Sequence, residues 1–181
     1  MQGILYNRRP TECKFRIDSE PIFWYHGGMT ITWFGQSCFR IETKEGNILI
    51  DPFSKDIGLR PPKARDDLVL ITHQHYDHNN VQDAGPETFI IDGSGEYERK
   101  GISVRGILSY HDRAQRSERG LNTVYVIKAE DITLCHLGDL GQDELTDAQV
   151  EDIGDVDILK VPGGGTYTID AKGADQVIGQ I

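Results

Sequence analysis

The chain has 181 residues, of which 38% are hydrophobic, and it carries a formal net charge of −10 at pH 7. This length suits one domain with a sizeable core. The acidic balance argues against a nucleic-acid-binding protein, because such binding depends on basic surface. No stretch reaches the ~18 apolar residues of a membrane span, and no secretory signal is visible. The three cysteines form no Cys-x-x-Cys pair, which favours reduced thiols and a cytoplasmic protein.

Two stretches are distinctive before Thr30. Residues 13–18 alternate apolar and polar side chains, which predicts a half-exposed strand. Residues 22–25 form a dense aromatic patch. His26 has no potential metal ligand beside it in sequence, so we interpret it as a surface histidine.

From Thr30 onward the pattern predicts three strands, at residues 31–34, 38–41 and 47–50. Asp51 ends the third strand. An aspartate there either orients a metal-bound histidine through its ring N–H or accepts hydrogen bonds from turn amides. Residues 54–67 are predicted to be a loop, and their four basic side chains either contact an anionic substrate or are solvated.

The densest group of polar side chains is His73-Gln74-His75-Tyr76-Asp77-His78, directly after an apolar run at residues 68–71. Neutral imidazole and carboxylate groups are good ligands for zinc and similar divalent ions. Alternate residues of an extended segment face the same way, so His73, His75 and Asp77 can converge, and a turn can add His78. The alternative is a loop of solvated histidines.

The middle of the chain continues with strands at residues 88–91 and 102–108, separated by a glycine-rich turn at residues 93–97. His111 follows the second of these strands, as His73 follows the earlier apolar run. The residues alone leave open whether His111 is a metal ligand. Residues 113–120 contain three arginines, which either recognise a phosphate or carboxylate or are solvated.

The last third of the chain alternates strands and helices. Residues 122–127 and 132–137 look like a hairpin pair. Thr146 and Gln149 form a capping box at the start of a helix that Gly154 can end. A strand follows at residues 156–161, and a last helix, capped by Thr168, is expected to run to about Gln180.

Five motifs together resemble the metallo-β-lactamase superfamily. They are residues 33–39 (WFGQSCF), 49–53 (LIDPF), 73–78 (HQHYDH), 109–112 (SYHD) and 136–141 (HLGDLG). Their order is that of a branch containing L-ascorbate-6-phosphate lactonase-like proteins and Zn-dependent hydrolases of the β-lactamase fold. The resemblance covers residues 29–181. It leaves residues 1–28 as an N-terminal extension that either adds a strand or dimer contact, or is a translated upstream segment packed on the surface.

The resemblance implies an α/β fold, an αββα sandwich of two mixed β-sheets flanked by helices. It implies two divalent metal ions, zinc or manganese. One ion would be held by His73, His75 and His111. Asp77, His78 and Asp139 would hold the second, with Asp139 bridging and Asp77 also orienting the nucleophile. Three further residues would support these ligands: Asp51, Asp112 and His136.

The sequence departs from the family at its C-terminal end. The family's last ligand is a histidine beyond one more strand, whereas no histidine follows His136 here. We therefore expect a domain that lacks the last C-terminal elements, an incomplete second metal site and an exposed sheet edge. Truncation, a strand from a partner subunit and weak binding of the second ion are the three explanations.

The function implied is a metal-dependent hydrolase. A metal-bound hydroxide would attack a small-molecule ester, lactone or phosphodiester, which could be anionic. His111 or Asp112 would assist with protons. A catalytically silent metal-binding scaffold and a nuclease are the alternatives, and a homo-oligomer is compatible with both sequence and resemblance.

Overall fold

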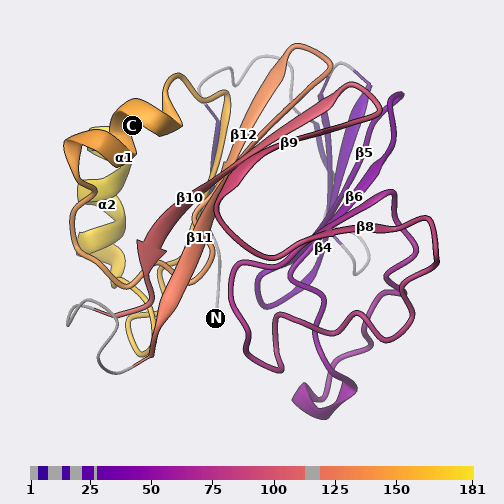
Figure 1. The fold of residues 1–181 in the computed structure, drawn as a ribbon. Coiled ribbons are helices and arrows are strands. Elements are labelled where there is room, and N and C mark those ends of the chain that lie inside the picture. Colours follow the sequence, from indigo (N-terminus) through magenta and orange to yellow (C-terminus); the bar gives the residue numbers. More distant parts are fainter. Residues whose placement is uncertain (1–3, 8–13, 17–21, 27, 113–118) are drawn as a thin grey trace.

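The computed structural model describes residues 4–7, 14–16, 22–26, 28–112 and 119–181, which form two facing β-sheets (Figure 1). The six-stranded sheet has the order β1 (Ile4–Asn7), β13 (Ile158–Val161), β12 (Ile132–His136), β11 (Leu121–Ala129), β10 (Ile102–Tyr110) and β9 (Gly95–Arg99). The seven-stranded sheet has the order β2 (Lys14–Arg16), β3 (Ile22–His26), β4 (Met29–Gly35), β5 (Cys38–Glu42), β6 (Asn47–Ile50), β7 (Leu68–Leu70) and β8 (Phe89–Ile91).

Both sheets are mixed, as the resemblance implied. In the six-stranded sheet only the β12–β13 pair is parallel, whereas β6, β7 and β8 run parallel in the seven-stranded sheet. The predicted hairpin of β11 and β12 is confirmed. The glycine-rich turn predicted at residues 93–97 is shorter than expected, because β9 begins at Gly95 and pairs with β10.

The main core lies between the two sheets, and alternation along each strand produces it. On β6, Ile48 and Ile50 face the opposite sheet, while Leu49 faces outward. On the six-stranded sheet, Val104 and Tyr125 belong to the same inner core. Strands whose two faces are both covered have continuous apolar sequences, which explains the apolar runs at residues 48–50 and 68–71.

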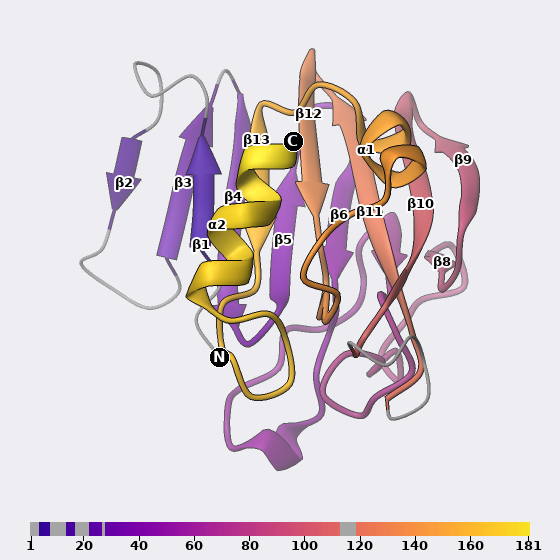
Figure 2. The ribbon, with the colours of Figure 1, turned by 90° about the vertical axis from the view of Figure 1, so that its left-hand side faces the viewer.

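The two outer faces are covered differently. Helices α1 (Asp147–Ile153) and α2 (Ala171–Gln180) lie on the outer face of the six-stranded sheet (Figures 1 and 2). Outward-facing Leu49 and Val69 of the seven-stranded sheet pack instead against Phe53 and Ala64. These two residues belong to the segment that contains the short 3-10 helix η1 (Lys55–Ile57). No described helix is long and apolar enough to cross a membrane.

The helix ends test the capping predictions. Thr146 caps α1, Gln149 completes the capping box, and Gly154 ends the helix, all as predicted. The cap predicted for the last helix is wrong: Asp170, not Thr168, accepts a hydrogen bond from the Gly173 amide. Both residue types cap well, so the sequence alone did not separate two candidates only two positions apart.

The N-terminal segment contributes strands to both sheets. β1 pairs antiparallel with β13, and β3 pairs antiparallel with β4 (Figure 2). An exposed sheet edge was expected; in the six-stranded sheet β1 covers the outer edge of β13 and is itself the edge strand. The predicted strand over residues 13–18 is described only at β2, and Cys13 lies outside the described residues.

Candidate metal centre

The candidate ligands lie in loops at the ends of buried strands from both sheets. The segment from His73 to His78 follows β7, His111 follows β10, and Asp139 follows β12. The loop after β7 is tied to the opposite sheet, because the Thr123 amide donates to the Thr72 carbonyl at 2.8 Å. The buried Tyr125 hydroxyl also donates to the Ile71 carbonyl at 2.9 Å. These cross-sheet bonds hold the two sets of ligands against each other.

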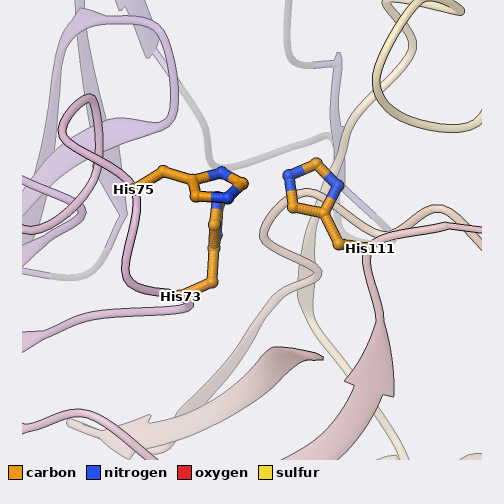
Figure 3. A group of neighbouring side chains, drawn as sticks. All are labelled: His73, His75 and His111. Atoms are coloured by element: carbon orange, nitrogen blue, oxygen red, sulfur yellow. The ribbon is translucent and has the colours of Figure 1, made fainter. Parts of the chain in front are cut away.

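Three histidines converge in the first group. His73, His75 and His111 each offer a ring nitrogen, and these atoms all lie within 4.8 Å of one another (Figure 3). His73 and His111 are buried, whereas His75 is partly exposed. Nε2 of His73 and Nδ1 of His111 have no hydrogen-bond partner among the residues that the structure describes. A buried polar atom without a partner is costly, and a bound metal ion would relieve that cost.

A second group shares His73 and adds His78 and Asp139, again with ligand atoms within 4.8 Å. Nε2 of His78 lies 3.6 Å from Oδ2 of Asp139 and 3.7 Å from Oδ2 of Asp77. Oδ2 of Asp139 also lies 3.7 Å from Nε2 of His111, so this oxygen faces both groups. Asp77 therefore contacts the second group at His78, and the Asp77 side chain is partly exposed.

Asp51 contacts His78 of the second group from the buried interior of the protein. Its Oδ2 lies 3.0 Å from Nδ1 of His78, a close but poorly aligned contact, and 3.2 Å from Nε2 of His136. Its Oδ1 accepts hydrogen bonds from the Thr72 amide at 2.8 Å and hydroxyl at 3.0 Å. Asp51 therefore combines the two roles left open by the sequence: it accepts turn hydrogen bonds and contacts a candidate ligand histidine. His136 touches Asp51 rather than either ligand group.

The second carboxylate oxygen of Asp139, Oδ1, is held by a hydrogen bond. The Ser37 hydroxyl donates to Oδ1 of Asp139 at 3.2 Å, and the Asp139 amide donates to Oδ1 of Asn122 at 3.0 Å. Gly138, with φ of 59°, turns the chain just before Asp139. A Cβ there would collide with Thr72 at 2.9 Å, so only glycine fits this approach. The orientation of Asp139 is therefore built into the fold.

The loop after β10 is closed by its own contacts. Asp112 is buried and accepts a hydrogen bond from the Arg119 amide at 2.8 Å. The Gly141 amide donates to the Tyr110 carbonyl at 2.9 Å, and a Cβ on Gly141 would overlap the backbone of His111. These contacts hold His111 at the end of its strand. Residues 113–118, with two of the three arginines singled out from the sequence, lie outside the described residues.

The electrostatics of the centre suit metal binding. Burial, followed by the nearby charge of His78, lowers the pKa of His73 to about 3, and burial also lowers the pKa of His75. Burial opposes charge on His78 too, but Asp51 and Asp139 outweigh it and raise the pKa of His78 to about 10. At neutral pH the metal-free protein thus keeps free lone pairs on His73 and His75. Neutral imidazoles with a nearby carboxylate form a donor set that fits zinc and similar ions.

Sequence reasoning missed three supporting residues: Ser37, Asn122 and Lys160. Lys160 is buried on β13, with Nζ 3.4 Å from the Ser37 carbonyl and 4.7 Å from the centroid of the Phe39 ring. Burial lowers its pKa to about 8. The lysine inside the apolar run at residues 156–161 was a visible signal. Ser37 lies within the motif at residues 33–39, but no local pattern indicates its hydrogen-bond partner Asp139, which is 102 positions away.

A cleft of about 450 Å³ opens beside His73 and His75 and gives the centre access from outside. Its size is that of a small-molecule site. Its other lining residues come from the loops after β7 and β8, from the ends of β10 and β11, and from Arg119. They are Thr72, Gln74, Asp92, Gly93, Ser94, Leu108, Arg119, Leu121 and Thr123.

Comparison with known proteins gives consistent matches. Residues 30–181 match the Beta-lactamase superfamily domain. A UPF0173 metal-dependent hydrolase of Thermoplasma volcanium is 30% identical over 176 residues, covering 82% of this chain and 77% of the relative. A crystal structure from Thermotoga maritima, of a protein assigned to the Zn-dependent hydrolases of the metallo-β-lactamase superfamily, has 40% identity and a TM-score of 0.69. That match covers 84% of this chain and 70% of that one.

A more distant structure shows the fold alone. Igni18, a metallo hydrolase from Ignicoccus hospitalis, is 20% identical, with a TM-score of 0.53 over 81% of this chain and 75% of that chain. The family match spans nearly all of the chain after the N-terminal segment, and the His–Asp centre lies inside it. The chain therefore belongs to the metallo-β-lactamase superfamily.

Proposed function

We propose that this protein is a metal-dependent hydrolase that cleaves an ester, lactone or phosphodiester bond in a small molecule. The observation that carries the proposal is the convergence of His73, His75 and His111, with unpartnered ring nitrogens on two buried members. Relatives named as metal-dependent hydrolases support the reaction class. Donors of this kind favour zinc, with manganese as the second choice.

The residues divide into two ligand groups. His73, His75 and His111 would hold one ion, while His78 and Asp139 would hold the second, with Asp77 or the shared His73 completing it. Divalent ions, when bound, lower the pKa of a coordinated water and polarise the bond to be cleaved. Asp139 keeps Oδ2 toward both groups because Ser37 holds Oδ1. Asp77 has a side chain 25% exposed, so it can reach a water or substrate that enters the centre and accept a proton from it.

The cleft volume and the net charge support a small substrate, and the free cysteines support a reducing compartment. The cleft is far smaller than a nucleic-acid groove, and the net charge of −10 works against a polyanion. Cys38 and Cys135 are free and buried, which fits a cytoplasmic protein. These features favour a small-molecule hydrolase over a nuclease.

The test measures metal content and turnover together. Bound metal per chain is determined by elemental analysis for the parent, for His75→Ala, and for Asp83→Ala, which changes an exposed acid outside the centre. Each protein is then given zinc or manganese and assayed on 4-nitrophenyl acetate, a γ-lactone and bis-4-nitrophenyl phosphate. We expect metal and turnover in the parent and in Asp83→Ala, and a sharp fall of both in His75→Ala.

The other outcomes discriminate the alternatives. Metal binding without turnover of any substrate would indicate the silent scaffold. Turnover of the phosphodiester alone, followed by cleavage of RNA, would indicate a nuclease. Metal content in His75→Ala equal to that of the parent would contradict the assignment of the centre.

A further inference from the structure

The cleft beside the centre has an unusual lining for an acidic protein. Leu108 and Leu121 are large apolar side chains with 46% and 40% of their surface exposed, and both line the cleft. Exposed leucines are common singly, but here two lie on adjacent strands and face one concave space. Their exposure follows from the fold.

The two leucines extend the inner face of the six-stranded sheet. On β10, Ile102 and Val104 face the core between the sheets, and Leu108 follows in the same alternation. On β11, Tyr125 faces the same core, and Leu121 is four residues earlier on the same face. This face of the sheet therefore continues past the packed core, across Gly106 and Thr123, and ends in the two leucines of the cleft.

The register brings the leucines close together. Leu108 pairs with Thr123 and Tyr110 pairs with Leu121, so the leucines are diagonal neighbours across β10 and β11. Diagonal side chains on one face of an antiparallel pair are about 7–8 Å apart, a distance that one short alkyl or aryl group can bridge. Because β10 leads directly to His111, this face of the sheet ends at the metal centre.

Among the described lining residues, Arg119 is the one cationic side chain of the cleft. Arg119 lines the cleft, and its guanidinium carbon lies 4.2 Å from the centroid of the Tyr167 ring. The Arg119 backbone amide donates a hydrogen bond to Asp112, which holds the main chain at this position. Within the described part of the chain, no carboxylate lies within ion-pair distance of the Arg119 guanidinium. The planar donors of a guanidinium suit a carboxylate or phosphate anion.

Of the lining residues that the structure describes, Asp92 is the one acid, and it accepts a hydrogen bond from Gln74. Oδ2 of Asp92 lies 3.3 Å from Nε2 of Gln74, which donates to it. An anionic ligand in this chain, with its net charge of −10, needs a local positive group to enter. Arg119 supplies that group at the cleft wall.

We propose that the cleft binds an amphipathic anion: a substrate whose short apolar part lies on Leu108 and Leu121 and whose carboxylate or phosphate is held by Arg119. This inference rests on the proposed hydrolase function and adds the class of substrate. It predicts poor use of small, neutral, polar esters.

Binding is tested first, without turnover. Calorimetry on the metal-loaded protein compares hexanoate, hexanol, hexyl phosphate and acetate. We expect hexanoate or hexyl phosphate to bind about tenfold more tightly than hexanol, since one charge-assisted contact of ~1.4 kcal/mol is worth that factor. The stronger of the two anions identifies the headgroup. Acetate, which lacks the apolar part, should bind more weakly than hexanoate.

Two variants separate the parts of the site. Arg119→Gln should reduce the preference for anion over alcohol to near unity. Arg65→Gln should leave that preference intact, because Arg65 is exposed and is not among the described residues that line the cleft. Leu108→Asn should remove the advantage of hexanoate over acetate. If Arg119→Gln retained the full anion preference, the anion would be held by the metal centre alone and the proposal would be overturned. Equal binding of hexanoate and acetate to the parent would also overturn it.

Turnover then connects the site to catalysis. The ratio of kcat/KM for a 4-nitrophenyl hemiester of adipic acid to that for 4-nitrophenyl hexanoate should exceed one in the parent and fall in Arg119→Gln. If neither ester is cleaved but the binding pattern holds, the hydrolase proposal fails while the cleft assignment stands. If both are cleaved at a ratio that Arg119→Gln does not change, the cleft assignment fails instead.

Discussion

Ser37 and Asp139 are 102 positions apart in the chain, yet the Ser37 hydroxyl donates a 3.2 Å hydrogen bond to Oδ1 of Asp139. This bond leaves Oδ2 of Asp139 facing His78 and His111. Hydrogen bonds to a ligand carboxylate orient it before the metal arrives. A turn of the seven-stranded sheet thereby positions a candidate ligand carried by the opposite sheet.

Ser37→Ala should therefore weaken metal binding without unfolding the protein. Loss of such a supporting contact typically lowers metal affinity about 10–100-fold. Competition with a chromogenic chelator measures the affinity. Ser37→Thr should restore most of it, and Ser103→Ala, at an exposed position on β10, serves as control. An unchanged affinity in Ser37→Ala would show that Asp139 needs no help from Ser37.

Asp51→Asn should destabilise the metal-free protein. Asp51 is fully buried and accepts from Thr72 while contacting His78 and His136, so an amide NH₂ would face hydrogen-bond donors. We expect a loss of about 3–5 kcal/mol in the free energy of unfolding, the usual cost of disrupting a buried charged pair. Asparagine tolerates the φ of 47° at this position, so backbone strain does not confuse the result.

The loss in Asp51→Asn should also depend on pH. Burial opposes ionisation of Asp51, but His78 and His136 lower its pKa well below the ordinary value of 3.8. The carboxylate therefore stabilises the folded state above about pH 4, and that contribution is lost as the pH falls further. The difference between parent and variant in urea unfolding should shrink below pH 4. A difference that stayed constant into acid would contradict the ionised role of Asp51.

Lys160→Met should stabilise the metal-free protein at neutral pH. The folded-state pKa of Lys160 is lowered from 10.5 to about 8, so the unfolded chain binds its proton more tightly. Burial of this charge costs at most about 3.5 kcal/mol at pH 7, at ~1.4 kcal/mol for each pKa unit. This destabilisation of the folded state has its full value below pH 8 and disappears as the pH rises to 10.5. The stability gain in Lys160→Met, measured by urea unfolding, should follow that curve.

Gly141→Ala should disrupt the centre through the backbone. The added Cβ would overlap the backbone of His111, which has no flexible group to move aside. We expect a loss of at least 2 kcal/mol, about the cost of overpacking a rigid site, together with weaker metal binding. Gly179→Ala is the matched control, because Gly179 is exposed in α2 with open space around it. That change should stabilise the protein by about 0.5–1 kcal/mol.

Much of the fold was visible in the sequence because local rules produce it. Apolar runs at residues 48–50 and 68–71 contain the buried residues of strands β6 and β7, since both faces of these strands are covered. The capping box of Thr146 and Gln149 formed as predicted, because its partners are three residues apart. His73, His75 and His78 were identifiable as candidate ligands by their density alone.

Only the tertiary structure decided the features that join distant segments. The edge pairing of β1 with β13 and the support of Asp139 by Ser37 depend on how the two sheets pack, which no local pattern encodes. The same holds for the sharing of His73 between both ligand groups. A sequence determines which residues form strands and which side chains can bind metal, because both follow from neighbours along the chain. Which of those side chains meet is determined by the packing of the sheets, because ligand geometry depends on distances between loops far apart in sequence.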